Sequence, residues 1–245
     1  MVRAAQYYEN KTKVNQSLWD YLLAREYYYR AGEWDQAADI AIGARQYLAR
    51  WGHIELAMSI LSQSIETTSN ITKAYATGQL ANMYQGLGDW KTALKMYSEV
   101  KEIFEKEGDL KNLATALHQM GMIHQHLGNY TEAAELYQQS LDIFKEVGDM
   151  LSFATTLHNL GIIHQRQGNY AEAAKLYQQS LDIEKELGDE IGIATSLGQL
   201  GIIHQDQGNY AEAAKFYQQS MDIFKEVGDK SGIATTLHQL GMIHQ

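Results

Sequence analysis

Histidine is the residue type in this sequence best suited to chemistry, and its positions are regular. Nine histidines are present. One series, forty residues apart, consists of His124, His164, His204 and His244. A second series consists of His118, His158 and His238, interrupted by Gly198. Neutral imidazole binds zinc and moves protons near neutral pH, so these series are the first candidates for a metal or catalytic site.

The spacing of these histidines argues against a zinc site. Within one forty-residue period, His118, His124 and His126 are six and two residues apart. Two ligands on one helix face are expected four residues apart, as in H-E-x-x-H. A side chain that recurs in period after period is more typical of packing between helices. We therefore expect partly buried packing histidines, with neither a metal nor a cofactor.

The carboxylates give no better candidate for catalysis. Glu172 and Asp182 have counterparts in the other periods, as solvated or capping groups do, whereas a catalytic pair would be singular. The sequence also contains no G-x4-G-K-[ST], no G-x-G-x-x-G and no H-E-x-x-H. We therefore expect that the chain is not an enzyme.

The composition limits the expected partners. The chain has 245 residues and a formal net charge of −10, and an acidic chain repels phosphate backbones, so we expect no nucleic acid partner. It has no cysteine, and therefore no disulfide or thiolate chemistry. No apolar run approaches the roughly 20 residues that cross a bilayer, and the first residues do not resemble a signal peptide. We expect a cytoplasmic protein with no membrane partner.

A forty-residue period organises most of the sequence. The segments GNYTEAAELYQQSLDI, GNYAEAAKLYQQSLDI and GNYAEAAKFYQQSMDI begin at Gly128, Gly168 and Gly208. Without insertion or deletion, four full repeats cover 71–110, 111–150, 151–190 and 191–230, and a half repeat covers 231–245. Such likeness indicates recent duplication or deliberate construction. A period of this length predicts stacked units that bury a continuous core.

Two helical patterns fill each repeat. In the third repeat, the two stripes comprise Ala154, Leu157, Leu160, Gly161 and His164, and then Tyr170, Ala173, Ala174, Tyr177 and Leu181. The chain has no proline, which agrees with helices joined by very short turns. Each repeat is therefore expected to be a helical hairpin.

The expected ends of these helices are marked by glycine, asparagine and aspartate. Gly168 suits a left-handed helix end, and Asn169 with Glu172 is predicted to form a capping box. Asn129 with Glu132, and Asn209 with Glu212, would repeat this device. At the other joint, Gly148 is expected to end one helix and Asp149 to cap the next.

These residues resemble the tetratricopeptide repeat, whose pattern is W-x2-L-G-x2-Y followed by an alanine and an aromatic residue. The positions that carry the resemblance are Leu157, Leu160, Gly161, His164, Gly168, Ala173 and Tyr177. The period of forty is similar to that of kinesin light chains, LGN-type adaptors and bacterial signalling ATPases of the STAND class. The resemblance implies an all-α fold, a right-handed superhelical solenoid of antiparallel helix hairpins. It covers about residues 71–245.

The first seventy residues break the period. We expect helices near 15–31, 34–50 and 54–67, followed by a polar break at ETTSN. These divergent helices are interpreted as a cap, or as the junction to an upstream module, because SLWDYLLAREYYYRAGEWDQAADI resembles the segment after the nucleotide-binding module of STAND ATPases. An aromatic cluster, made of Trp19, Tyr27, Tyr28, Tyr29 and Trp34, is interpreted as core packing, with a docking surface as the alternative.

The resemblance also implies a binding site, because tetratricopeptide arrays bind partners along the concave face formed by the first helix of each repeat. This face would carry amides, hydroxyls, imidazoles and a few apolar groups, with little charge. The predicted groove residues are Gln79, Asn82, Thr115, His118, Gln119, Met122, Gln125, Thr155, His158, Asn159, Ile162, Gln165, Thr195, Gln199, Gln205 and Gln239. A ladder of amides could hold the backbone of an extended peptide, since an amide both donates and accepts. A solvated polar face without a ligand is the alternative.

The expected function is therefore non-enzymatic recognition of a protein or extended peptide in the concave groove, as the sensor arm of a STAND-type signalling ATPase. The alternative is a self-associating or engineered repeat array without a specific ligand. Self-association would use the C-terminal edge, where the apolar residues of 231–245 have no second helix to cover them.

Overall fold

A computed structural model describes residues 1–15 and 17–243, which form helices and contain no strand. The thirteen helices in this part of the chain are α1 (Val2–Asn15), α2 (Leu18–Arg30), α3 (Trp34–Arg50), α4 (Ile54–Thr67), α5 (Asn70–Gly86), α6 (Trp90–Glu107), α7 (Leu110–His126), α8 (Tyr130–Val147), α9 (Met150–Arg166), α10 (Tyr170–Leu187), α11 (Glu190–Asp206), α12 (Tyr210–Val227) and α13 (Lys230–Ile243). They divide into two compact units, Met1–Ala116 and Leu117–Gln245.

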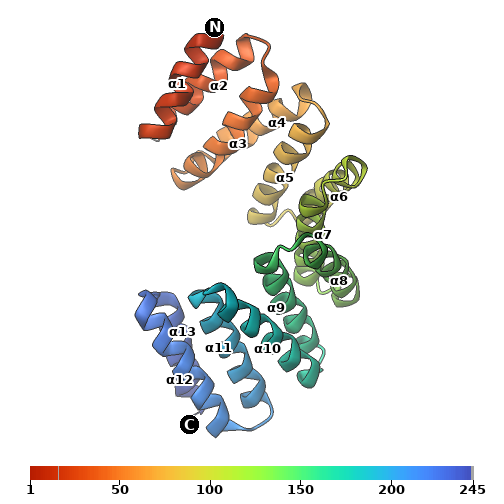
Figure 1. Ribbon diagram of the computed structural model, residues 1–245, viewed down its shortest axis with the longest axis vertical. Helices are drawn as coiled ribbons and strands as arrows, with labels where there is room; N and C mark the ends of the chain where they lie inside the picture. Colours follow the sequence, from red (N-terminus) through yellow and green to blue (C-terminus); the bar gives the residue numbers. More distant parts are fainter. Residues whose placement is uncertain (16, 244–245) are drawn as a thin grey trace. The chain divides into compact units, whose positions relative to one another are not determined.

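Consecutive helices pack against each other as hairpins within each unit, and Figure 1 labels them in chain order. In the second unit, α9 packs on α10, α11 packs on α12, and α10 packs on α11. The prediction of an all-α helical repeat fold is thus confirmed. From α5 onward, odd-numbered helices are the first helices of the predicted repeats and even-numbered helices are the second.

The turns follow the predicted glycine pattern. Gly148 and Gly188 end α8 and α10 in the left-handed conformation, with φ of 73° and 69°. A residue with a side chain is strained there, which explains why glycine recurs at this joint. Asp149 then caps α9, because its carboxylate accepts from the backbone N–H of Ser152 at 3.2 Å.

The predicted asparagine capping boxes are wrong in their side-chain part. Asn129, Asn169 and Asn209 stand at N-cap positions, but none of their side chains makes a capping hydrogen bond. The amide of Asn129 lies instead 3.4 Å from His124 Nδ1. The glutamates that would complete two of the boxes pair with lysines on the helix surface, in the pairs Glu172–Lys175 and Glu212–Lys215.

The core of the second unit is built from the apolar stripes of both helix types. Tyr137, Tyr177 and Tyr217 are completely or almost completely buried, at 0%, 0% and 1% exposure. Leucines from the first helices pack with them, for example Leu157 and Leu160 with Tyr137. The first unit has its own core around Leu48, Leu61 and Leu80.

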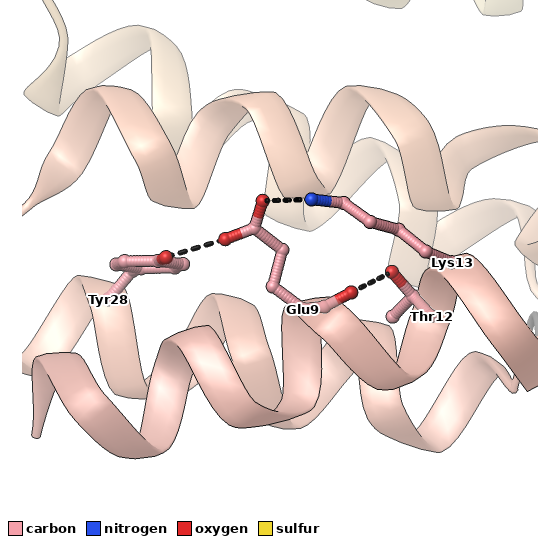
Figure 2. A network of polar contacts seen from close by, with 4 residues as sticks. All are labelled: Glu9, Thr12, Lys13 and Tyr28. Atoms are coloured by element: carbon pink, nitrogen blue, oxygen red, sulfur yellow. Dashed lines mark hydrogen bonds and ion pairs between the residues drawn. The ribbon is translucent and has the colours of Figure 1, made fainter.

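The first helix of the chain was not predicted. Its buried residues, Ala5 and Thr12, are too few and too small to give a clear apolar stripe in the sequence. A hydrogen bond attaches it to α2, because Tyr28 donates to Glu9 Oε2 at 2.6 Å (Figure 2). Within α1 itself, Lys13 lies 3.5 Å from Glu9 Oε1. The helix expected near 15–31 begins only at Leu18, whereas those expected at 34–50 and 54–67 have the predicted bounds.

The last predicted helix, 231–245, corresponds to α13, which is described over Lys230–Ile243. His244 and Gln245, the final residues of the predicted half repeat, lie outside the described residues. Leu237 and Met242 on α13 are 52% and 42% exposed. Self-association through this helix stays a prediction.

Candidate peptide groove

The predicted groove residues lie on the first helix of each hairpin, and none of them is buried. Those on α5 and the start of α7, namely Gln79, Asn82 and Thr115, belong to the first unit. The others lie on α7, α9, α11 and α13 of the second unit. All are half-buried or exposed, so this face of the second unit is available to solvent.

First helices of the second unit contact each other through some of these residues and their neighbours. His118 on α7 contacts Thr156 on α9, with 2.8 Å between Nδ1 and Oγ1. The Gln165 amide on α9 donates to Asp206 Oδ2 on α11 at 3.4 Å. Residues of α11 and α13, including Thr195, Gln199 and Gln239, line one pocket of about 260 Å³. The structure thus brings these predicted residues of α7, α9, α11 and α13 onto adjoining helices.

Tyrosines of the second helices orient a row of glutamines. Each bond joins residues twelve positions apart, at 2.7 to 2.9 Å, in the pairs Tyr137–Gln125, Tyr177–Gln165 and Tyr217–Gln205. The tyrosine hydroxyl donates and the amide oxygen accepts. Burial raises the pKa of all three hydroxyls, that of Tyr217 to about 12, so they remain protonated donors at neutral pH. The glutamine side chains are therefore fixed through their amide oxygens. Their amide N–H groups remain as donors, and that of Gln165 already donates to Asp206.

Sequence reasoning missed the tyrosines as residues that orient the predicted groove glutamines, because it assigned them only to the core. The signal was available as a tyrosine that follows each of these glutamines by twelve residues. The groove threonines have a different local role, since Thr115, Thr155 and Thr195 each donate to the backbone oxygen four residues earlier in the same helix. Their oxygens can still accept a hydrogen bond.

In the first repeat, the tyrosine of the second helix has a different hydrogen-bond acceptor. In the later repeats a glycine faces the tyrosine, and a Cβ on Gly161 would lie 2.7 Å from Tyr177 Cε1. Ala81 stands at this place in the first repeat and does carry a Cβ. There the hydroxyl of Tyr97 donates to Asn82 at 2.6 Å, while Gln85 Oε1 is buried without a partner among the described residues. The alanine therefore accompanies a shift of the tyrosine hydroxyl to a new acceptor.

This difference gives a prediction for the third repeat. Replacing Gly161 by alanine should lower the free energy of unfolding by about 1–3 kcal/mol, because Tyr177 must move and its bond to Gln165 is lost. Adding Ile162→Asn recreates the acceptor of the first repeat. A double-mutant cycle in urea should then show a favourable coupling of about 1 kcal/mol. Additive effects of the two substitutions would contradict this account of the tyrosine shift.

His118 is bound on both ring nitrogens. Thr156 donates its only hydroxyl proton to Ser152 O at 2.7 Å, so the contact with His118 requires that Nδ1–H donates to Thr156 Oγ1. His118 Nε2 is then the acceptor for the Asn159 amide at 3.4 Å. Burial lowers the pKa of His118 to about 4, in agreement with this neutral ring. His118 is thus half-buried, and both of its ring nitrogens already have hydrogen-bond partners within the chain.

Two further histidines, His158 and His204, behave as packing residues, whereas His53, His126 and His238 are exposed. Burial lowers the pKa of His158 to about 4, and its ring lies 5.2 Å from that of Tyr177. His204 stacks on Phe216 with ring centroids 5.2 Å apart. Within residues 1–15 and 17–243, no three His, Cys, Asp or Glu side chains are grouped so that they could hold a metal ion.

Comparison with known families decides the classification. A family model described as "Tetratricopeptide repeat" matches residues 72–146, 152–226 and 192–245, which is more than half of the chain. The chain belongs to the tetratricopeptide repeat family. Tetratricopeptide repeat proteins are generally non-catalytic scaffolds for protein–protein interaction.

Solved tetratricopeptide structures share the fold at low sequence identity. BtubC from P. vanneervenii has a TM-score of 0.71 and 16% identity, over 93% of this chain and 89% of that chain. A putative kinesin light chain with nearly identical repeats, from Podospora anserina, has a TM-score of 0.63 and 20% identity, over 78% of this chain and 96% of that chain. At such identities the similarity shows the fold alone. No curated protein matches the sequence significantly.

A STAND protein with a tetratricopeptide repeat sensor, from Pyrococcus horikoshii, is similar over almost the whole chain. Its TM-score is 0.77 at 17% identity, and the match covers 98% of this chain but only 43% of that chain. The tetratricopeptide repeats described here thus correspond in fold to less than half of that protein. None of the described helices is both long and apolar enough to cross a membrane.

The aromatic cluster at the start of the chain is divided between core and surface. Tyr28 is 5% exposed and packs with Ala5 and Ala37, as the core interpretation requires. Trp19 and Trp34 are 71% and 48% exposed. Exposed tryptophans are compatible with the alternative of a docking surface, which stays a prediction.

Proposed function

We propose that this chain is a non-enzymatic recognition module that binds an extended segment of a partner protein along the first-helix face of the second unit. The observation that carries the proposal is the row of glutamines held by tyrosine hydroxyls at forty-residue intervals. The tetratricopeptide family is generally one of interaction modules, which supports a binding role and no catalysis.

The chemistry of this face favours a peptide backbone as the ligand. Gln119, Asn159 and Gln199 are half-buried amides on successive first helices, and each offers both a donor and an acceptor. A peptide in extended conformation presents unpaired N–H and C=O groups that match such amides. Side chains that are fixed before binding lose less conformational entropy on binding than mobile ones. The hydrogen bonds from tyrosine to glutamine therefore favour a higher affinity for the peptide. The low charge of the face favours a segment that is neutral or mixed in charge.

The wider setting is also a proposal. The STAND protein of similar fold carries its tetratricopeptide repeats as a sensor, so the present chain would act as the sensor arm of a cytoplasmic signalling ATPase of this class. In that role, binding of a protein to the groove would control the attached nucleotide-binding module. Affinity for a partner would remain measurable on the repeats alone.

Affinity capture with a groove variant tests the binding role. The variant replaces Gln119, Asn159 and Gln199 by alanine, and a captured partner should bind it about ten- to a hundred-fold more weakly, since each amide contributes a hydrogen bond of roughly 0.5–1.5 kcal/mol. The matched control replaces Gln138, Gln178 and Gln218, exposed glutamines of the second helices whose amides bond only to an aspartate one turn later.

The two variants make the result decisive. Partners identified by mass spectrometry from a lysate of the source cells should be retained by the control and lost by the folded groove variant. Equal capture by both variants, or no capture by the unmodified chain, would contradict binding at this face. Circular dichroism at 222 nm confirms that each variant remains helical.

A further inference from the structure

A histidine fills the space between neighbouring first helices in two successive repeats. His118 lies between α7 and α9, bonded to Thr156 and Asn159, and its ring is 5.4 Å from that of Tyr137. His158 occupies the equivalent place beside Tyr177 in the next repeat. In each case the imidazole rests on the tyrosine of the second helix.

The next repeat has the same surroundings and no imidazole. Gly198 stands where the histidine would be, and the pocket of about 260 Å³ opens at this point between α11, α12 and α13. Its lining includes Tyr217, Thr236 and Gln239, which are the counterparts of Tyr137, Thr156 and Asn159. The ring support and both polar partners of the imidazole are therefore present in the pocket.

The pocket offers one hydrogen-bond acceptor and one donor, as a neutral imidazole requires. Thr236 donates its hydroxyl proton to Gly232 O at 2.8 Å, as Thr156 does to Ser152, so Thr236 Oγ1 is left to accept. Gln239, which forms no hydrogen bond with another described residue, supplies an amide donor in place of that of Asn159. Ala194 and Ile202 add apolar groups to the walls, and Asp229 is also part of the lining.

We propose that this pocket binds a histidine side chain of the partner segment, which inserts where the chain's own histidines lie in the two preceding repeats. The peptide setting rests on the proposed function, but the pocket itself does not. Neutral imidazole carries a donor and an acceptor on opposite sides of one small ring, and it matches Thr236 Oγ1 and the Gln239 amide together. Phenylalanine offers neither group, and tryptophan offers a donor only.

Binding of 4-methylimidazole, the histidine side chain without its backbone, tests the pocket directly. Titration of the unmodified chain, followed by NMR, should shift the side-chain amide of Gln239 and the methyl groups of Thr236 and Ala194 in a saturable way. The variant Gly198→His should lose these shifts, because its own imidazole occupies the pocket. A Cβ at Gly198 meets only Ser220 Oγ, at 3.6 Å, so the helix accepts the substitution.

Two controls separate the pocket from general binding. Gly198→Ala adds one methyl group and leaves the polar partners free, so its affinity for 4-methylimidazole should stay within about threefold of the unmodified chain, a difference under 0.7 kcal/mol. The ring 3-methylthiophene, which has no nitrogen, should bind at least about tenfold more weakly than 4-methylimidazole. Non-saturable shifts, shifts that persist in Gly198→His, or equal binding of the two rings would overturn the proposal.

Selection from a displayed library of random peptides distinguishes histidine binding in this pocket from peptide binding along the groove. Peptides selected on the unmodified chain should contain histidine and should lose binding to Gly198→His. Peptides that bind the unmodified chain and Gly198→His equally, but fail to bind the variant of Gln119, Asn159 and Gln199, would support the groove and overturn the pocket. Saturable binding of 4-methylimidazole without any selected peptide would leave the pocket standing and contradict peptide binding by the groove.

Discussion

Replacing Tyr177 by alanine should lower the free energy of unfolding by about 3–5 kcal/mol, the range measured when large buried aromatic residues are truncated. Tyr177 is 0% exposed and packs with Leu181, Leu197 and Leu200 between two repeats. It also lies directly against Gly161, where even a Cβ would be too close. Loss of the ring therefore leaves a cavity that rigid helices on both sides cannot fill.

Urea denaturation followed by circular dichroism measures this effect, and two variants define its origin. Tyr177→Phe removes only the hydroxyl bond to Gln165 and should cost about 1 kcal/mol. Tyr210→Ala, at a tyrosine that is 55% exposed, should change stability by less than about 0.5 kcal/mol. A loss below about 1 kcal/mol for Tyr177→Ala would show that the repeats repack around the missing ring, contrary to the rigid packing described here.

Glu184→Phe should raise the free energy of unfolding at pH 7 by about 1–3 kcal/mol, the usual gain from burying an aromatic side chain. Glu184 is 5% exposed and stands where the other repeats have Phe104, Phe144 and Phe224. Its Oε2 atom is buried without a hydrogen-bond partner among the described residues. A phenylalanine has room here, because Gly192 faces Glu184 as Gly232 faces Phe224.

The pH dependence identifies the carboxylate as the cause. Burial, with a smaller contribution from the charge of Asp189, raises the pKa of Glu184 above its ordinary value of 4.5. The folded protein therefore binds this proton more tightly than the unfolded chain, and the penalty for the charge is complete only above the folded pKa. As the pH falls through the folded pKa towards 4.5, the carboxylate is protonated and the cost of burying its charge disappears. The gain in the free energy of unfolding from Glu184→Phe should therefore become smaller.

Urea unfolding of both proteins at pH 7 and at pH 4.5 tests this prediction. Glu184→Gln serves as the control, because it removes the charge and keeps the shape, and its stability relative to the original chain should also fall as the pH falls. A difference between Glu184→Phe and the original chain that is constant over this range would contradict the proposed role of the charge.

The contrast between Ala81 and Gly161 shows how far sequence reasoning reached within the site. The substitution of alanine for glycine is visible in the aligned repeats, and so is the asparagine beside it. That the Tyr97 hydroxyl bonds to Asn82, while Gln85 Oε1 has no partner among the described residues, is visible only in the structure. Such close contacts depend on packing and have no signature in one sequence.

The capping motifs and the first helix show two further limits. Aspartates and asparagines share a preference for the N-cap position, but only the aspartates form the capping bond here, as Asp149 does and Asn129 does not. The helix Val2–Asn15 carries little apolar pattern of its own and is held by contacts such as that of Tyr28 with Glu9. Both outcomes depend on neighbours that the local sequence does not identify.

The sequence by itself determined the helical repeat, the tetratricopeptide class and the bounds of α3 and α4, and it predicted which residues lie on the first helices of the hairpins. It could do so because a forty-residue period, helical stripes and glycine at left-handed turns act locally and recur. Only the tertiary structure decided that tyrosines orient the glutamines, that His118 is bonded on both nitrogens, and that Gly198 opens a pocket. Each of these features depends on distances between side chains of different helices. Tertiary packing sets those distances, and the pattern of a single helix does not reveal them.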